Sequence, residues 1–135
     1  MTLGTAIVGA GTLYFAIAFV AGFGLGALRE LVVAPRLGPL AAVAIEVPVM
    51  LAISWIAARR IVARFALPVG VPRLGTGLVA FALLQAAEVA LGLALGTSLA
   101  AQAAALATLR GLIGFAAQIV FALLPLAVAR TPEVP

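Results

Sequence analysis

Apolar residues gather along the chain into four long runs that charged residues barely interrupt. The runs cover residues 5–28, 39–58, 76–95 and 111–129. Each is close to the length of about 20 residues that an α-helix needs to cross a bilayer. The first and last runs hold no charged residue, and the other two hold one glutamate each. The pattern predicts an all-α membrane protein, a four-transmembrane-helix bundle that forms a single domain over residues 1–135.

Prolines and glycines mark the connections between these runs. Pro35, Gly38 and Pro39 separate the first run from the second, and Pro39 suits the first turn of a helix. A second group of prolines and glycines follows Leu67. Between the third and fourth runs, residues 99–109 form an alanine-rich segment that is too short to span a bilayer. We expect a short interfacial helix there.

The arginines indicate how the chain is oriented, because basic residues favour cytoplasmic loops. With four crossings, the N-terminus, the middle connection and the C-terminus lie on one side of the membrane. Arginine without lysine, and alanine without asparagine, suggest a high-GC bacterial genome. We therefore expect the bacterial inner membrane, with both termini in the cytoplasm. The arginines on the cytoplasmic side would be Arg59, Arg60, Arg64, Arg73 and Arg130, against three on the other side.

Composition excludes several kinds of chemistry. Hydrophobic residues make up 66% of the chain and charged residues 9%, whereas a soluble domain is about a quarter charged. The chain has no cysteine or histidine, and so lacks thiolate nucleophiles and the usual ligands of zinc and haem. Without lysine it cannot form a Schiff base. We expect no enzyme activity, no cofactor and no metal site. The net charge of +4 fits anchoring to anionic lipid, and we expect no nucleic-acid partner.

Four polar residues within the runs form the candidate site. An ionisable side chain inside a membrane is costly, so each one suggests a function. Glu46 lies seven residues into the second run, and Glu88 lies seven residues before the end of the third. Both are therefore about 10 Å below the same membrane face. Gln118 lies at a similar depth, and Gln85 is one helical turn from Glu88.

Three arginines form a candidate rim above these polar residues, namely Arg29, Arg36 and Arg110. Two interpretations of the whole cluster compete. In the structural one, the glutamates pair with Arg29 or Arg110, or are partly protonated, and hold the helices together with the glutamines. In the functional one, Glu46 and Glu88 line a site that binds a proton or a cationic ligand.

The segment 26–59 resembles a group of small uncharacterised four-helix inner-membrane proteins of alphaproteobacteria. The resemblance implies no activity. It does imply that Arg29, Arg36 and Glu46 belong to a shared pattern. The matching pieces are Leu28-Arg29, Ala34-Pro35-Arg36-Leu37-Gly38, Glu46 with Pro48, and Ser54-Trp55.

Two better-known families fit less well. The glycines before Arg29 resemble the start of bacterial fluoride channels, but the asparagine that those channels carry in their second helix is missing here. Small multidrug transporters also have four helices and a membrane glutamate. That glutamate lies in their first helix, where this chain has none.

The sequence therefore favours a non-enzymatic accessory or structural subunit of a membrane complex. The alternative is a small proton-coupled transporter or carrier, working as a dimer around Glu46 and Glu88. A membrane enzyme with one of these glutamates as acid or base ranks third. Besides the lipid bilayer, the expected partner is a second copy of the chain or a larger membrane complex.

Overall fold

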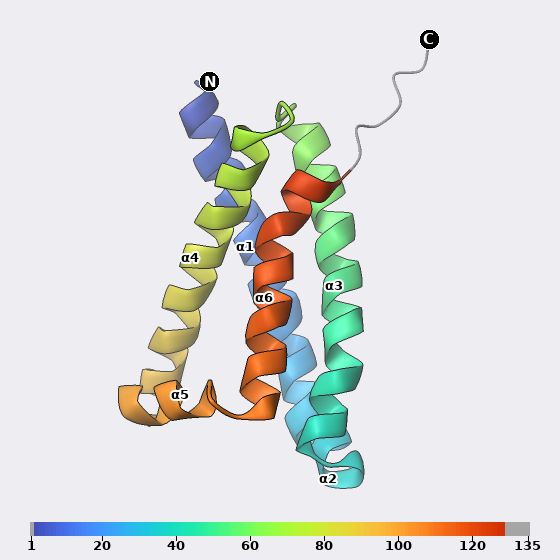
Figure 1. Cartoon of the computed structure of the whole chain (residues 1–135), viewed down its shortest axis with the longest axis vertical. Helices are drawn as coiled ribbons and strands as arrows, with labels where there is room; N and C mark the ends of the chain where they lie inside the picture. The colour runs from blue at the N-terminus through green and yellow to red at the C-terminus, as the bar shows by residue number, and fades with distance from the viewer. Residues whose placement is uncertain (1, 129–135) are drawn as a thin grey trace.

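The computed structural model describes residues 2–128, and no strand occurs among them (Figure 1). Its four long helices are each long and apolar enough to cross a membrane. This arrangement confirms the predicted four-helix bundle. The last residue of the predicted fourth run, Ala129, and Arg130 lie outside the described residues. The long helices are α1 (Leu3–Leu28), α3 (Pro39–Arg64), α4 (Val71–Ala94) and α6 (Leu109–Ala127).

The helices form a ring in which α1 and α6 each pack between α3 and α4. In the view of Figure 1, the N-terminus, the connection 65–70 and the end of α6 lie at the upper end of the bundle. The connections 29–38 and 95–108 lie at its lower end. We use upper and lower in this sense throughout.

The connection between the first two spans is helical, and the helix continues past residue 28, where the first apolar run ends. After α1 the chain continues through a π-helical turn, η1 (Arg29–Val33), and through α2 (Ala34–Leu37). A proline ring normally presses on the carbonyl four residues earlier. The wider π turn accommodates Pro35 without ending the helix. The chain reverses only at Gly38, whose φ of 89° favours glycine.

The other connections follow the sequence more closely. Helix α4 begins at Val71, five residues earlier than predicted, because Gly70 (φ 98°) makes the turn and Pro72 fits the first helical turn. The expected interfacial helix is α5 (Leu99–Ala105), which lies across the lower end (Figure 1). Its first turn is capped by the Ser98 hydroxyl, which accepts a hydrogen bond from the Ala101 N–H.

Small residues bring the helices together in the upper half. A Cβ built on Gly11 would lie 2.7 Å from the Val79 side chain, and one on Gly77 would collide with the Ala122 carbonyl. Helix α4 therefore approaches both α1 and α6 closely there, as small residues permit in membranes. The buried core lies mainly in this half and includes Ala10, Ala58, Ala80 and Val62.

In the middle of the bundle, Tyr14 joins α1 to α6, the helix diagonally opposite. The residue is 0% exposed, its ring stacks on Phe121 at 4.3 Å, and its hydroxyl donates to the Phe121 carbonyl at 2.7 Å. That carbonyl needs an outside donor, because its helical partner would be the missing N–H of Pro125. One side chain thus satisfies the defect that the proline creates in α6.

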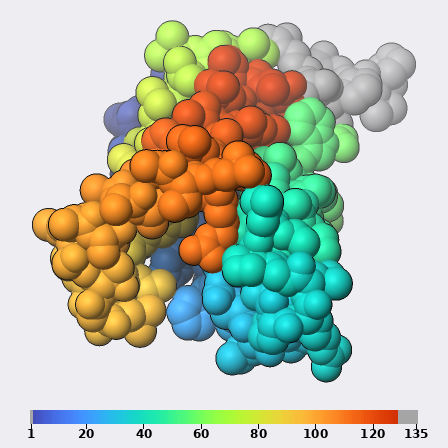
Figure 2. Space-filling model, turned by 60° about the horizontal axis from the view of Figure 1, so that its bottom comes forward, coloured from blue at the N-terminus to red at the C-terminus, as the bar shows by residue number. Residues whose placement is uncertain are grey.

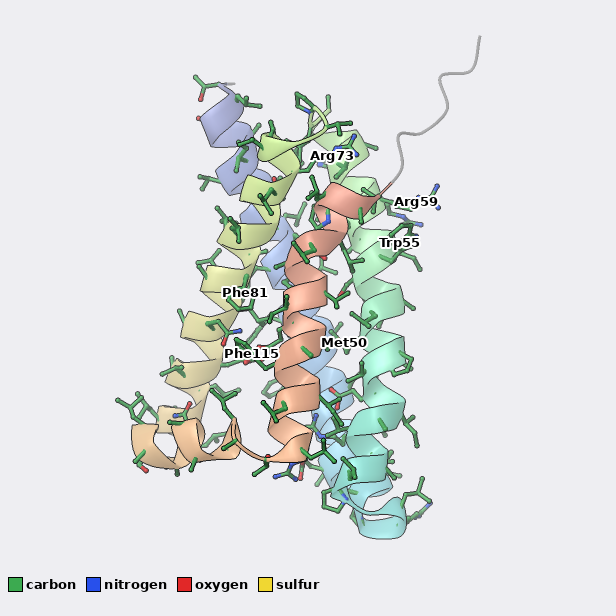
Figure 3. The ribbon with its side chains drawn as sticks, viewed as in Figure 1. Met50, Trp55, Arg59, Arg73, Phe81 and Phe115 are labelled. Atoms are coloured by element: carbon green, nitrogen blue, oxygen red, sulfur yellow. The ribbon has the colours of Figure 1, made fainter. Side chains whose placement is uncertain are left out.

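At the upper end, Arg73 of α4 is hydrogen-bonded to the residues that follow α3 and α6. Its side chain is buried, with Nε donating to the Leu67 carbonyl at 3.1 Å and Nη1 to the Val128 carbonyl at 2.9 Å. These carbonyls follow α3 and α6, so the cation lies where helix dipoles favour it. By contrast, Trp55 and Arg59 point away from the bundle (Figure 3). Nothing in the sequence distinguishes Arg73 from the other arginines that were predicted to lie on the cytoplasmic side.

We predict that Tyr14→Phe lowers the free energy of unfolding by about 1 to 3 kcal/mol, because the Phe121 carbonyl loses its donor in an apolar setting. The matched control is Pro125→Ala, which restores the donor within α6. Tyr14→Phe should therefore cost markedly less in a Pro125→Ala background. Thermal unfolding in detergent measures both, and equal costs in the two backgrounds would contradict the assignment.

Candidate functional site

Below the contact of Tyr14 with Phe121, the four long helices separate around a cavity of about 480 Å³. The space-filling view from below shows the hollow between α1, α6 and the end of α4 (Figure 2). A smaller hollow of about 340 Å³ adjoins it and is lined in part by Arg29, Glu30 and Arg110. The cavity is therefore open at the lower end and closed toward the upper end.

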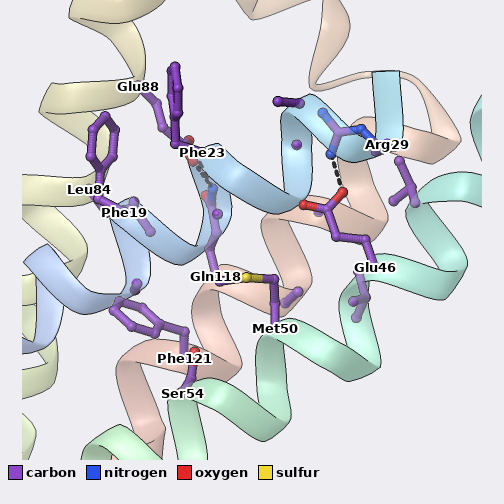
Figure 4. Close-up of a pocket in the computed structure, with 18 of the residues that line it drawn as sticks. Phe19, Phe23, Arg29, Glu46, Met50, Ser54, Leu84, Glu88, Gln118 and Phe121 are labelled. Atoms are coloured by element: carbon purple, nitrogen blue, oxygen red, sulfur yellow. Dashed lines mark hydrogen bonds and ion pairs between the residues drawn. The ribbon is translucent and has the colours of Figure 1, made fainter. Parts of the chain in front are cut away.

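One wall of the cavity carries an ion pair. Arg29 donates through Nη1 to Glu46, and through Nε to Glu30 at 3.1 Å (Figure 4). The Arg29 and Glu46 side chains are 29% and 14% exposed, whereas Glu30 is 61% exposed and lies at the rim. The pair ties the end of α1 to α3, and it compensates the charge of Glu46 inside the bundle.

The opposite wall carries a chain of amides that ends at Glu88. Gln118 Nε2 lies 2.8 Å from both carboxylate oxygens of Glu88. Its own oxygen accepts from Gln85 Nε2 at 2.6 Å. Both amides therefore donate in the direction of Glu88, which fixes their orientation. Neither ion pair among residues 2–128 includes Glu88, so its carboxylate is held by hydrogen bonds alone.

The structure thus separates the predicted cluster into two groups around one cavity. Glu46 lies with Arg29, and Glu88 lies with Gln85 and Gln118. Of the other predicted rim charges, Arg110 reaches the mouth, whereas Arg36 is exposed on α2 and lines neither hollow.

Several residues of the cavity wall were not predicted. The wall is mostly apolar, and Gly22 and Gly26 leave room in it. The signal of this in the sequence is the four-residue spacing of Ala18, Gly22 and Gly26, which places all three on one face of α1. The other unpredicted wall residues include Phe19, Phe23, Met50, Ser54 and Leu84.

No protein-family model, curated protein or solved structure matches this chain. The cavity is therefore the basis for inferring its function. Within residues 2–128, no three side chains of histidine, cysteine, aspartate or glutamate gather as they would to hold a metal ion. The groups present in these residues are suited to binding a ligand: an apolar wall, two carboxylates that share Arg29 and one carboxylate without a cation.

We predict that Arg29→Met is more destabilising than the double change Arg29→Met with Glu46→Met, because the single change leaves Glu46 uncompensated inside the bundle. The coupling between the two sites should be about 1 to 3 kcal/mol. A double-mutant cycle of unfolding free energies measures this coupling. Additive single effects would show that the pair does not join α1 to α3.

We also predict that the cavity contains water. The chain has no cysteine, so single cysteines report cleanly. Ala117→Cys, which lines the cavity, should react with a membrane-impermeant maleimide at least about tenfold faster than Ala86→Cys, which is exposed on the outer face of α4. The reason is that only a thiol in contact with water ionises readily. Equal rates in reconstituted vesicles would indicate a dry cavity.

Proposed function

We propose that the protein is a small membrane carrier that binds a cation or a proton at Glu88, inside the one-sided cavity. The observation that carries the proposal is a carboxylate on the wall of an open, mainly apolar cavity, with no cationic partner among residues 2–128. Carboxylates within transmembrane segments mark ion and proton pathways, because an uncompensated charge there is costly. A purely structural role would need no cavity beside Glu88.

The two glutamates have unequal roles in this proposal. Glu46 stays paired with Arg29 and holds α1 against α3 at the mouth. Glu88 exchanges its proton for the cation: the carboxylic acid releases H⁺, and the carboxylate then pairs with the incoming charge. Arg29, Glu46 and Glu30 are the other charged groups on the wall of the same cavity. This division replaces the symmetric pair of carboxylates that the sequence suggested.

Because the upper half is closed, the cavity of the proposed carrier is accessible from one end of the bundle. Many transporters expose a site near the middle of the bilayer to one face at a time. Here the stacked rings of Tyr14 and Phe121 separate the cavity from the upper end. With both termini in the cytoplasm, the cavity would load from the periplasmic face, and the closed half would have to open for release.

A second candidate is the accessory subunit that the sequence favoured. It is supported by a row of small residues on α4, Ala82, Ala86, Ala90 and Ala94, which is exposed on the outer face. Small residues in a row let helices approach closely in a membrane, so this row is available to another helix. A stoichiometric foreign subunit in native mass spectrometry would favour this candidate, and a bare homodimer would favour the carrier.

We predict that purified protein in proteoliposomes dissipates an imposed proton gradient when at least one monovalent cation is added. The trial cations are sodium, potassium, ethylammonium and benzyltrimethylammonium. Glu88→Gln should lower the rate by at least about tenfold, because the exchangeable proton is gone.

The matched control is Arg59→Gln, which also removes one charge but lies exposed, near the upper end and away from the cavity. It should keep the wild-type rate. No response to any of the four cations, or full activity in Glu88→Gln, would refute the carrier.

A further inference from the structure

We infer that the ligand of this cavity is a monovalent organic cation with a compact apolar body, seated against Glu88. The inference rests on the proposed function, because it names the ligand class of the same site. It follows from the charge balance, from the oxygen ligands on offer, and from the shape and composition of the wall.

The pairing of charges on the wall favours one positive charge on the ligand. Arg29 contacts Glu46 and also Glu30, which lies exposed at the rim. Within residues 2–128, Glu88 is therefore the wall carboxylate that no cation contacts. A monovalent cation would neutralise it. A dication would bring a second charge into a largely apolar space without a partner, and burying an unpaired charge is expensive. An anion would meet Glu88 directly and gain little from Arg29, which already contacts two carboxylates.

The oxygen ligands on the wall do not suit a bare metal ion. Calcium takes about six to eight oxygen ligands, and magnesium keeps several waters when it binds. Within the described residues Glu88 belongs to no group of three or more side chains that could hold a metal ion, and the Gln118 oxygen is already engaged by Gln85. An organic cation spreads its charge over a larger, weakly hydrated group, so one carboxylate is enough for it.

Aromatic side chains on the wall that also carries Glu88 provide a surface for such a ligand. Phe19 and Phe23, one turn apart on α1, line the same cavity as Glu88 and are drawn with it in the close-up (Figure 4). Phe23 is 60% exposed although it lines the cavity, so its ring is free to meet a ligand. A cation within about 6 Å of an aromatic face is attracted by the ring.

The size of the cavity and its remaining wall fit an apolar body. Its volume of about 480 Å³ falls within the range of about 300 to 1,000 Å³ for small-molecule sites. Met50 and Leu84 provide further apolar wall, and methionine adapts its shape to a ligand. A Cβ built on Gly114 would meet nothing within 4 Å, so open space lies beside α6.

The test compares two molecules of the same shape, benzyltrimethylammonium and its uncharged carbon analogue neopentylbenzene. Binding to protein in lipid nanodiscs is measured by equilibrium dialysis, and empty nanodiscs correct for partition into lipid. We expect saturable binding of the cation with one site per chain, and no saturable binding of the neutral analogue. Sodium in about 100-fold excess over the cation should not displace it.

Two variants test the site in different ways. Glu88→Gln removes the charge, and Gly114→Leu fills the open space while keeping every charge. Each should weaken binding of the cation by at least about tenfold. Arg59→Gln should bind like wild type. Saturable binding of neopentylbenzene, displacement by sodium, or unchanged binding in Gly114→Leu would overturn the assignment of the ligand class.

The ligand class and the carrier can fail separately. If benzyltrimethylammonium does not bind, but sodium or ethylammonium dissipates the proton gradient in a Glu88-dependent way, the ligand class is wrong and the carrier stands. If benzyltrimethylammonium binds through Glu88 and no cation dissipates the gradient, the ligand class stands and the carrier is wrong.

Discussion

The hydrogen bond from Tyr14 to the Phe121 carbonyl is the interaction on which the shape of the bundle depends. Pro125 leaves that carbonyl without a donor within its own helix, in a medium that offers no water to replace it. Because Tyr14 lies on the diagonally opposite helix, satisfying the carbonyl draws α1 and α6 together at this level. Above it the helices pack on small residues, and below it they separate around the cavity.

The number and approximate position of the spanning helices could be predicted from composition. Charge-free runs of bilayer length admit few structures other than spanning helices, so the four spans could be read directly. Their ends were harder to predict because backbone geometry decides them. Pro35 looks like a helix breaker, yet the π turn of η1 carries the helix past it. Gly70 and Pro72 start α4 earlier than its apolar run indicates.

The candidate site was predicted in part for a similar reason. Helical rise places Glu46, Glu88 and Gln118 at one depth, and depth follows from sequence position alone. Which partner each side chain meets depends on how the helices are rotated and ordered, which the sequence does not show. The cavity itself depends on Gly22 and Gly26, where the absence of a side chain can mean either tight packing or empty space.

The hydrogen bonds of Arg73 have a consequence for how the two ends respond to ionic strength. Its guanidinium donates to peptide carbonyls, which carry no net charge, so they form no ion pair at the upper end. In residues 2–128 all three carboxylates, Glu30, Glu46 and Glu88, belong to the lower half. In this part of the chain, added salt therefore screens the charges around the cavity more than it weakens the hydrogen bonds that join the upper end.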